Sequence, residues 1–230
     1  MSYVRLVDVT KRFGDVTAVD HLNFEIEKGS CFSMLGPSGC GKTTTLRMVA
    51  GFEDLSEGEV WVGDRLLSSP KKNHYLPPEK RNFGMVFQAF AVWPHLSVYE
   101  NVAFAMRVIE APRQMIQRRV NAVLDVVGLR DKYRDFPSQL SGGEQPRVAI
   151  DRAIVNDPAI LIADEPTGNL DPETSWDIMD IFKRINAAGT TIVMATHDKN
   201  IVDTMQRRVV AIEDGKIVRD EQRGGYGYEN

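Results

Sequence analysis

The sequence predicts an α/β fold built on a mostly parallel sheet, and two kinds of observation support this. Residues 30–35, 159–163 and 191–195 form short, nearly continuous apolar runs, and stretches with helical periodicity separate them. Runs of this kind are typical of strands that helices cover on both faces. In addition, a glycine-rich turn joins the first run directly to a helical stretch at residues 42–50, as in a strand, loop and helix unit.

The flanking segments predict a second, antiparallel part of the fold. Residues 4–9 and 22–26 alternate between apolar and polar side chains, which predicts an antiparallel β subdomain at the edge of the core. Residues 58–62 and 82–87 predict two more strands. The polar, proline-containing stretch 68–80 between them predicts an exposed loop.

The middle of the chain predicts a helical subdomain over about residues 90–155. Apolar residues recur there at helical spacing, and a further helix follows Ser141. Beyond this subdomain the pattern predicts a helix at residues 173–185 and a strand at residues 209–212, whereas the polar, glycine-rich residues 222–230 predict a frayed end.

Size and charge exclude several classes of protein. The 230 residues, 26% of them charged, suit one globular domain that spans residues 1–230. The 28 Lys and Arg against 32 Asp and Glu give a net charge of -4. The protein therefore has no overall positive potential to attract a nucleic acid, and we expect no nucleic-acid partner. No apolar run approaches the ~18 residues of a membrane span, and no apolar signal core opens the chain. Cys31 and Cys40 lie too close together in the sequence for a disulfide between them to stabilise a chain of this length. This favours the reducing cytoplasm as the location of the protein.

A phosphate-binding pattern follows the first buried strand. Residues 36–43 read Gly-Pro-Ser-Gly-Cys-Gly-Lys-Thr, which matches G-x-x-x-x-G-K-[ST] between a strand and a helix. Glycines let backbone N–H groups face a β-phosphate, while the lysine neutralises phosphate oxygens and the hydroxyl ligates Mg²⁺. The alternative is a chance glycine turn, but this context predicts a P-loop NTPase core. The expected nucleotide contacts are Gly36, Ser38, Gly39, Cys40, Gly41, Lys42, Thr43 and Thr44.

An acidic pair follows the apolar run at residues 159–163. Asp164 should lie at the same sheet edge as the phosphate loop, where it can hold Mg²⁺ together with Thr43. Glu165 should point differently and can polarise the water that attacks the γ-phosphate. A carboxylate that caps a neighbouring loop is the alternative, but a phosphate loop upstream favours the metal site.

A third motif, Leu140-Ser141-Gly142-Gly143-Glu144, precedes a helix. Alone it is typical of an anion site or of a plain N-cap. Together with the phosphate loop and the acidic strand, it makes the chain resemble the ATP-binding cassette (ABC) ATPases over nearly its whole length. The resemblance implies that this signature motif of one subunit closes over ATP held by the phosphate loop of another, in a head-to-tail dimer. The implied contacts in trans are Ser141, Gly142 and Gly143.

The same resemblance assigns four further residues. Phe13 matches the aromatic residue that stacks on adenine, the alternative being an apolar anchor of the edge sheet. Gln88 matches the glutamine that contacts Mg²⁺ and the attacking water while linking the core to the helical subdomain. Asp171 matches the loop that crosses the dimer interface. His197 matches the switch histidine near the γ-phosphate, which can orient Glu165, although a histidine after an apolar strand is often structural.

The resemblance also implies membrane partners. Phe90 and Trp93 match the border of a groove that receives a cytoplasmic helix of a permease, although ordinary packing also accounts for them. We therefore expect an ATPase that binds Mg-ATP, pairs with a second copy of itself and lies at the cytoplasmic face of the membrane on integral permease subunits. The alternatives are a cell-division-type ABC ATPase that regulates a membrane partner, a soluble non-transport ABC ATPase and, outside the family, a small P-loop kinase or GTPase.

Two features set the chain apart within the family. Its first part looks like the ATPases of sugar, iron and polyamine importers and its second part like those of cell division and lipoprotein release, so a natural hybrid and an engineered recombination both fit. In addition, Pro146 and Asp151 stand where glutamine and a small residue are common. With Ser141 as the cap, Pro146 falls just past the first helical turn, and a buried Asp151 is unfavourable unless Arg147 or Arg152 pairs with it. Both changes predict a less well placed signature helix.

Overall fold

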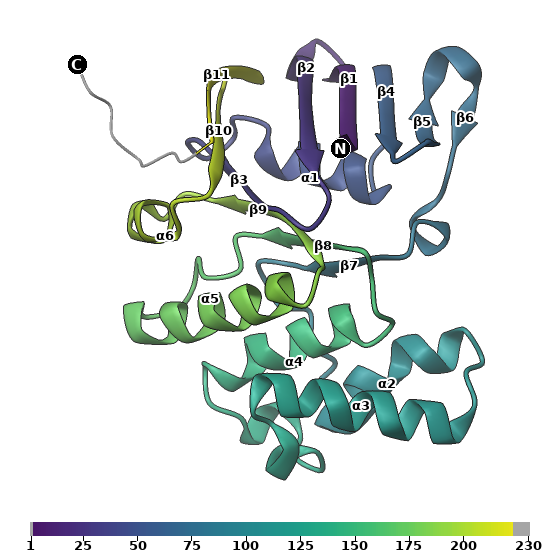
Figure 1. Cartoon of the computed structure of the whole chain (residues 1–230), viewed down its shortest axis with the longest axis vertical. Coiled ribbons are helices and arrows are strands. Elements are labelled where there is room, and N and C mark those ends of the chain that lie inside the picture. The colour runs from purple at the N-terminus through teal and green to yellow at the C-terminus, as the bar shows by residue number, and fades with distance from the viewer. Residues whose placement is uncertain (1, 223–230) are drawn as a thin grey trace.

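The computed structural model describes residues 2–222, and a six-stranded sheet lies at its centre (Figure 1). Its strand order is β11-β10-β3-β9-β8-β7, and every neighbouring pair is parallel except β10 and β11. The mostly parallel sheet expected from the apolar runs is therefore confirmed. Its strands are β3 (Cys31–Leu35), β7 (Phe83–Val86), β8 (Ile160–Asp164), β9 (Thr191–Thr196), β10 (Arg208–Glu213) and β11 (Lys216–Glu221).

A second sheet, with the order β2-β1-β4-β5-β6, is antiparallel throughout and lies at the opposite end of the molecule from helices α2 to α4 (Figure 1). The antiparallel sheet predicted from residues 4–9 and 22–26 is confirmed, and its two long strands extend beyond the predicted bounds. Its strands are β1 (Ser2–Phe13), β2 (Val16–Glu27), β4 (Glu57–Val62), β5 (Arg65–Ser69) and β6 (His74–Tyr75).

The stretch at residues 68–80 is exposed at residues 70–75, as its composition predicts, but it is not entirely a loop. It contains the end of β5, the short strand β6 and two 3-10 turns. Ser68 and Ser69 are buried, and their hydroxyls are both paired. The Ser68 hydroxyl accepts a hydrogen bond from Arg81, and the Ser69 hydroxyl donates one to Glu59. Partners outside the stretch therefore satisfy the polar groups of its first two residues, which are the part that is not exposed.

Helices cover both faces of the central sheet. Helix α1 packs between the two sheets, whereas α2 to α5 pack on the other face. The predicted helical region divides into α2 and α3, because the chain bends before Pro112, which precedes the first residue of α3. No helix within residues 2–222 is long and apolar enough to cross a membrane. The helices are α1 (Lys42–Ala50), α2 (Val98–Val108), α3 (Arg113–Val127), α4 (Glu144–Ile154), α5 (Pro172–Ala187) and α6 (Lys199–Met205).

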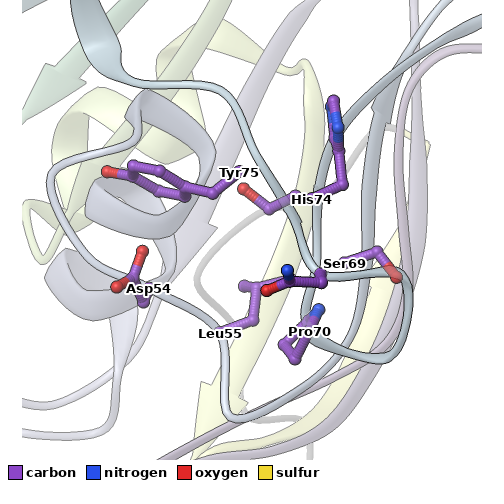
Figure 2. A pocket seen from close by; sticks show the side chains of 8 residues that line it. Asp54, Leu55, Ser69, Pro70, His74 and Tyr75 are labelled. Carbon is purple, nitrogen blue, oxygen red and sulfur yellow. The ribbon is translucent and has the colours of Figure 1, made fainter.

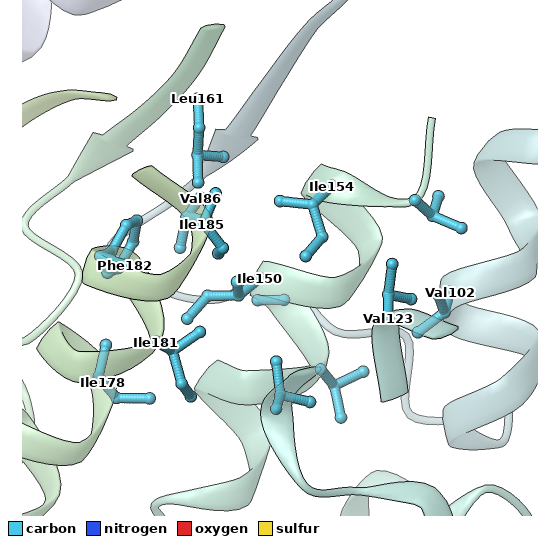
Figure 3. Packing of buried hydrophobic residues seen from close by; sticks show 14 of the residues in the cluster. Val86, Val102, Val123, Ile150, Ile154, Leu161, Ile178, Ile181, Phe182 and Ile185 are labelled. Atoms are coloured by element: carbon cyan, nitrogen blue, oxygen red, sulfur yellow. The ribbon is translucent and has the colours of Figure 1, made fainter. Parts of the chain in front are cut away.

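Neighbouring residues on the central strands point to opposite faces of the sheet. On β8, Ile160 packs with α1 and the antiparallel sheet, whereas Leu161 packs with α2 to α5. Because both faces are buried, these strands lack the polar alternation of a half-exposed strand. Figure 3 shows the buried side chains on the face that α2 to α5 cover, where Ile150 of α4 lies between the side chains of α5 and those of Val102 and Val123. Within the helical subdomain, α4 is thus the layer between α5 and the helices α2 and α3.

Helix α4 begins later than expected, which corrects the interpretation of Pro146. Gly143 is the N-cap, and Ser141 lies outside the helix with its carbonyl accepting from the N–H of Glu144. Pro146 is therefore the third helical residue. Because the N–H groups of the first turn have no intrahelical acceptor, a proline there leaves no helical hydrogen bond unmade. The expectation that Pro146 falls past the first turn, where it would disturb the helix, is wrong.

Asp151, by contrast, is fully buried on α4, and neither of its carboxylate oxygens has a hydrogen-bond partner. Neither arginine considered above pairs with it: Arg147 bonds to Asp177 and to the Val127 carbonyl, and Arg152 bonds to the carbonyls of the segment after Gln88. Burial raises the pKa of Asp151 well above its usual range. The neutral carboxylic acid is thus the form that the fold favours. The predicted frayed end at residues 222–230 lies outside the described residues apart from Gln222.

Candidate nucleotide-binding site

The phosphate loop connects β3 to α1 and has its shape fixed from two sides. Gly36, Gly39 and Gly41 all have φ between 84° and 155°, a region that side chains disfavour. A Cβ on Gly36 would meet the carbonyl oxygen of Ile212 in β10, and one on Gly41 would meet that of Ala18 in β2. Gly41 caps α1 without a side-chain hydrogen bond, so the first N–H groups of α1 face the loop, as anion binding requires.

Lys42 is enclosed by this loop. Its side chain is only 4% exposed, and its Nζ donates to the carbonyls of Gly36 at 2.7 Å and Pro37 at 3.0 Å, with the sulfur of buried Cys40 at 3.8 Å. Beside it lies a hollow of about 230 Å³. The residues that line the hollow are Ser38, Gly39, Gly41, Lys42, Thr43, Thr44, Gln88 and Glu165. The structure thus brings together the phosphate loop and two of the three predicted catalytic residues.

The predicted metal ligands Thr43 and Asp164 are in contact. Thr43 Oγ1 donates to Asp164 Oδ1 at 2.9 Å, at the end of β8. Burial raises the pKa of Asp164, and the hydrogen bond from Thr43 opposes that shift. A hydroxyl beside a carboxylate supplies the hard oxygen ligands that Mg²⁺ prefers, and Mg²⁺ usually takes only one or two carboxylates plus substrate phosphates. This donor set therefore fits the ion, although residues 2–222 contain no group of three His, Cys, Asp or Glu arranged for a metal.

Glu165 lies between the phosphate loop and His197. Its φ of 49° is left-handed, and its N–H donates to the carbonyl of Ala195 on β9 at 2.9 Å. This turn directs Glu165 away from the course of Asp164, as the sequence predicts. One carboxylate oxygen lies 2.8 Å from His197 Nδ1, and the other lies 4.0 Å from Lys42 Nζ. The His197 side chain is 53% exposed, and it does not itself line the hollow.

The signature motif lies beside the loop that carries Asp171. The Asp171 carboxylate caps α5 by accepting from the N–H of Thr174 at 2.9 Å and from its hydroxyl at 2.6 Å. A Cβ on Gly143 would meet Thr174 Cγ2 at 2.9 Å. Ser141 and Gly142 are exposed, and none of these residues lines the hollow beside Lys42. Within one chain, the signature motif and the phosphate loop therefore form separate surfaces.

Comparison with known proteins assigns the chain to a family. Residues 19–168 match the family model described as ABC transporter. The chain is an ABC transporter ATPase subunit. It binds and hydrolyses ATP, as the resemblance implied.

Both kinds of relative expected from the sequence are found, and each matches almost the whole chain. The cell division ATP-binding protein FtsE of Streptococcus pneumoniae is 48% identical over 232 residues, covering 100% of both chains. The trehalose/maltose import ATP-binding protein MalK of Thermococcus litoralis is 43% identical over 94% of this chain and 59% of its own. Among solved structures, the dimeric structure of MJ0796, a bacterial ABC transporter cassette, has a TM-score of 0.82 at 32% identity, covering 97% of this chain and 100% of its own.

Phe13 occupies an exposed position in this ABC ATPase. Its side chain is 48% exposed at the end of β1, and Lys11 Nζ lies 4.7 Å from its ring centroid. The ring is therefore not the buried apolar anchor considered as an alternative. It does not line the hollow either, so the structure leaves it available to a base beyond the phosphate region.

Two arginines contact the site's framework and were not predicted. Arg81 is buried and donates to the carbonyls of Met48 and Val49, at the end of α1 opposite the phosphate loop. Desolvation lowers its pKa to about 10. Arg152 of α4 contacts the segment that follows Gln88. A charged residue immediately before a predicted strand was the available signal for Arg81, but nothing local in the sequence indicates the partners of Arg152.

A second hollow of similar size lies away from the nucleotide site. Its volume is about 250 Å³, and Figure 2 shows the side chains that line it, from the loop after α1 and from β5 and β6. The Tyr75 hydroxyl there donates to the carbonyl of Gly51. The hollow lacks the glycine loop and the lysine of the first one, so it offers nothing for a phosphate chain. Its lining residues are Asp54, Leu55, Ser68, Ser69, Pro70, Asn73, His74 and Tyr75.

Proposed function

We propose that two copies of this ABC ATPase bind two Mg-ATP molecules between them, head to tail, and that their closing and opening drives an integral membrane permease. The observation that carries the proposal is the separation of the two half-sites. The phosphate loop and Glu165 line one hollow, whereas Ser141 and Gly143 are outside it. A second copy can supply the missing half. The dimeric cassette structure at 32% identity supports this arrangement.

In this proposal the whole chain, residues 1–230, acts as one nucleotide-binding domain, and its own residues divide the work on ATP. Lys42 and the loop N–H groups hold the β- and γ-phosphates, and the exposed ring of Phe13 stacks on adenine. Thr43, Asp164 and Gln88 hold Mg²⁺, which when bound offsets the negative charge of the phosphate oxygens. The signature glycines and Asp171 approach from the second copy.

Glu165 acts as the general base. Its carboxylate accepts a proton from the attacking water, and Gln88 helps to position that water. His197, 2.8 Å from the same carboxylate, fixes its direction and senses the γ-phosphate. When the γ-phosphate leaves, its contact with His197 is lost and the dimer opens.

A membrane partner is the other part of the proposal. The permease binds near Phe90 and Trp93, which places the ATPase at the cytoplasmic face of the membrane. Trp93 already packs against Phe104 with ring centroids 4.6 Å apart, and Phe104 remains 42% exposed. Regulation of a cell-division membrane partner is the second candidate, favoured by the 48% identity to FtsE over the full length of both chains.

The test is the solution mass of Glu165→Gln, measured by light scattering with and without Mg-ATP. This variant should bind ATP but barely hydrolyse it, so ATP should double its mass. Lys42→Ala in the same background should stay monomeric. A monomer that binds ATP as tightly as the parent would contradict autonomous dimerisation.

A mixing experiment tests the contribution in trans. Glu165→Gln copies that also carry Lys42→Ala lack a phosphate site, and copies that also carry Ser141→Arg lack a signature. Neither should dimerise alone, but a mixture should form heterodimers with one complete site. Absence of a heterodimer would overturn the head-to-tail arrangement.

A further inference from the structure

Arg152 joins the signature helix to the segment that follows Gln88. It lies near the C-terminal end of α4, and its Nη1 and Nη2 donate to the carbonyls of Ala91 at 2.5 Å and Phe90 at 2.9 Å. Its guanidinium carbon lies 4.7 Å from the ring centroid of Trp93. One side chain of α4 therefore holds three residues of a segment that begins two residues after Gln88.

The segment that Arg152 holds has an unfavourable backbone. Phe90 and Ala91 are consecutive non-glycine residues with φ of 56° and 48°. Residues with a Cβ rarely adopt this left-handed conformation, and it persists only where the surroundings impose it. Here the bend turns two successive carbonyls towards the same guanidinium. The shape of the segment and the position of Arg152 are thus linked.

The rest of α4 is also fixed against the strand that leads to Gln88. Gly84 on β7 has no room for a Cβ, because the carbonyl oxygen of Ala153 occupies that position. On the far side of the segment, Trp93 N–H donates to Asn101 Oδ1 at 2.9 Å, and Asn101 Nδ2 donates to the Trp93 carbonyl at 3.1 Å. Contacts on both sides of Gln88 therefore tie its segment to the helical subdomain.

We propose that Arg152 is a positioning residue that couples Gln88 to the signature motif. When a nucleotide draws Gln88 inward, the segment at residues 90–93 pulls on Arg152 and moves α4, and with it the segment from Ser141 to Gly143 that leads into the other end of the helix. The proposal rests on the proposed function, because it requires Gln88 and the signature motif to contact nucleotide. It assigns to Arg152 a role beyond the packing of α4.

Arg119 of α3 offers a matched control because it contacts the same end of α4. Its Nε donates to the carbonyl of Val155 at 3.1 Å, and its Nη2 lies 3.4 Å from Asp157. It therefore also binds a carbonyl at the end of α4, but neither of these contacts reaches residues 88–93. If Arg152 only secured the end of α4, lysine at either position would have the same effect.

The test compares Arg152→Lys with Arg119→Lys in a protein whose other two tryptophans are replaced, Trp61→Phe and Trp176→Phe, so that Trp93 is the sole reporter. Lysine keeps the charge but cannot bridge two carbonyls and stack at once. The measurements are the Trp93 emission with and without Mg-ATP, kcat and KM, the affinity for a fluorescent ATP analogue and the thermal midpoint.

Mg-ATP should change the Trp93 emission of the parent and of Arg119→Lys. In Arg152→Lys this change should be lost and kcat should fall about tenfold or more, while nucleotide affinity and the thermal midpoint stay near the parent values. If Arg152→Lys does not fold, Arg152→Gln, whose amide can still donate to one carbonyl, provides the same comparison.

Three results would overturn the proposal: an unresponsive Trp93 in the parent, a normal response and kcat in Arg152→Lys, or an equal loss in Arg119→Lys. Failure of the proposed function is seen separately, since Glu165→Gln would then stay monomeric with ATP, regardless of the result for Arg152→Lys.

Discussion

The imidazole Nδ1 of His197 lies 2.8 Å from one carboxylate oxygen of Glu165, and the other oxygen of that carboxylate lies 4.0 Å from Lys42 Nζ. Glu165 is thus held between two nitrogen groups, one from the first residue of α1 and the other from the residue that follows β9. One of these groups is enclosed in the phosphate loop and the other is half exposed. Only His197 lies within hydrogen-bond distance of Glu165, so the direction of the carboxylate depends on His197.

Replacing His197 should separate catalysis from binding. In His197→Ala the Glu165 carboxylate loses its orienting partner, so we expect kcat to fall by about 10²-fold or more while ATP affinity changes little. Steady-state kinetics and direct nucleotide titration check this. The exposed His95 supplies the control, and His95→Ala should keep the parent kcat of the isolated protein. A normal kcat in His197→Ala would show that Glu165 needs no such partner.

Replacing Asp164 should weaken the metal dependence of nucleotide binding. Asp164→Asn keeps an acceptor for the Thr43 hydroxyl but removes the negative charge. We expect hydrolysis to be nearly lost and the gain in ATP affinity on adding Mg²⁺ to shrink about tenfold or more. Titration calorimetry with and without Mg²⁺ measures the gain. Thr43→Ser, which retains the hydroxyl, should keep most of it. An unchanged Mg²⁺ gain in Asp164→Asn would contradict the assignment.

Removing the Asp151 carboxyl should stabilise the protein. The buried group has no partner, so Asp151→Ala should raise the free energy of unfolding by roughly 1–3 kcal/mol, at about 2–4 °C in Tm per kcal/mol. Asp180→Ala, on the exposed face of α5, should change Tm little.

The stabilisation should also depend on pH. The unfolded chain ionises Asp151 near its usual pKa of about 3.9, whereas the folded chain keeps the proton to higher pH because burial raises the pKa. The free energy of unfolding of the parent therefore falls as pH rises above the unfolded pKa, until the folded pKa is passed. Scanning calorimetry should find a larger gain from Asp151→Ala at pH 8 than at pH 5. An equal gain at both would mean that Asp151 is already ionised in the folded protein.

Arg81 should be among the most sensitive residues outside the nucleotide site. Its guanidinium donates to Met48, Val49 and Leu76 carbonyls and to the Ser68 hydroxyl, so Arg81→Lys loses most of these bonds while leaving their acceptors buried. We expect a loss of about 3 kcal/mol or more, measured by urea unfolding. Arg65→Lys, on exposed β5 surface, is the control. A loss no larger than that of the control would overturn this expectation.

The core could be predicted from sequence because its signals are local. Strands β3, β8 and β9 are buried on both faces and therefore read as continuous apolar runs, and the phosphate loop is defined by glycines and a lysine within eight residues. By contrast, β6 is two exposed residues and β11 alternates exposed and half-buried positions, so neither carries an apolar signal. Both exist because a neighbouring strand pairs with them, which is a tertiary effect.

The site also contains some contacts that local sequence signals predict and others that depend on the tertiary structure. The contact between Thr43 and Asp164 follows from a loop and a strand that end at one sheet edge, so it could be expected. The start of α4 could not, since Gly143 rather than the favourable cap Ser141 begins the helix. Nor could the partners of Arg152, which exist only because Phe90 and Ala91 adopt a left-handed backbone that their own side chains disfavour.

The glycines of the phosphate loop touch backbone from two different sheets, Gly36 against Ile212 of β10 and Gly41 against Ala18 of β2. The loop therefore acquires its curvature when the two sheets come together during folding, before any nucleotide arrives. A ligand that meets a loop already shaped does not have to offset the conformational entropy of ordering it, so more of the contact energy appears as affinity. Any substitution that loosens the seam between the two sheets would thus weaken phosphate binding without touching a residue that contacts phosphate.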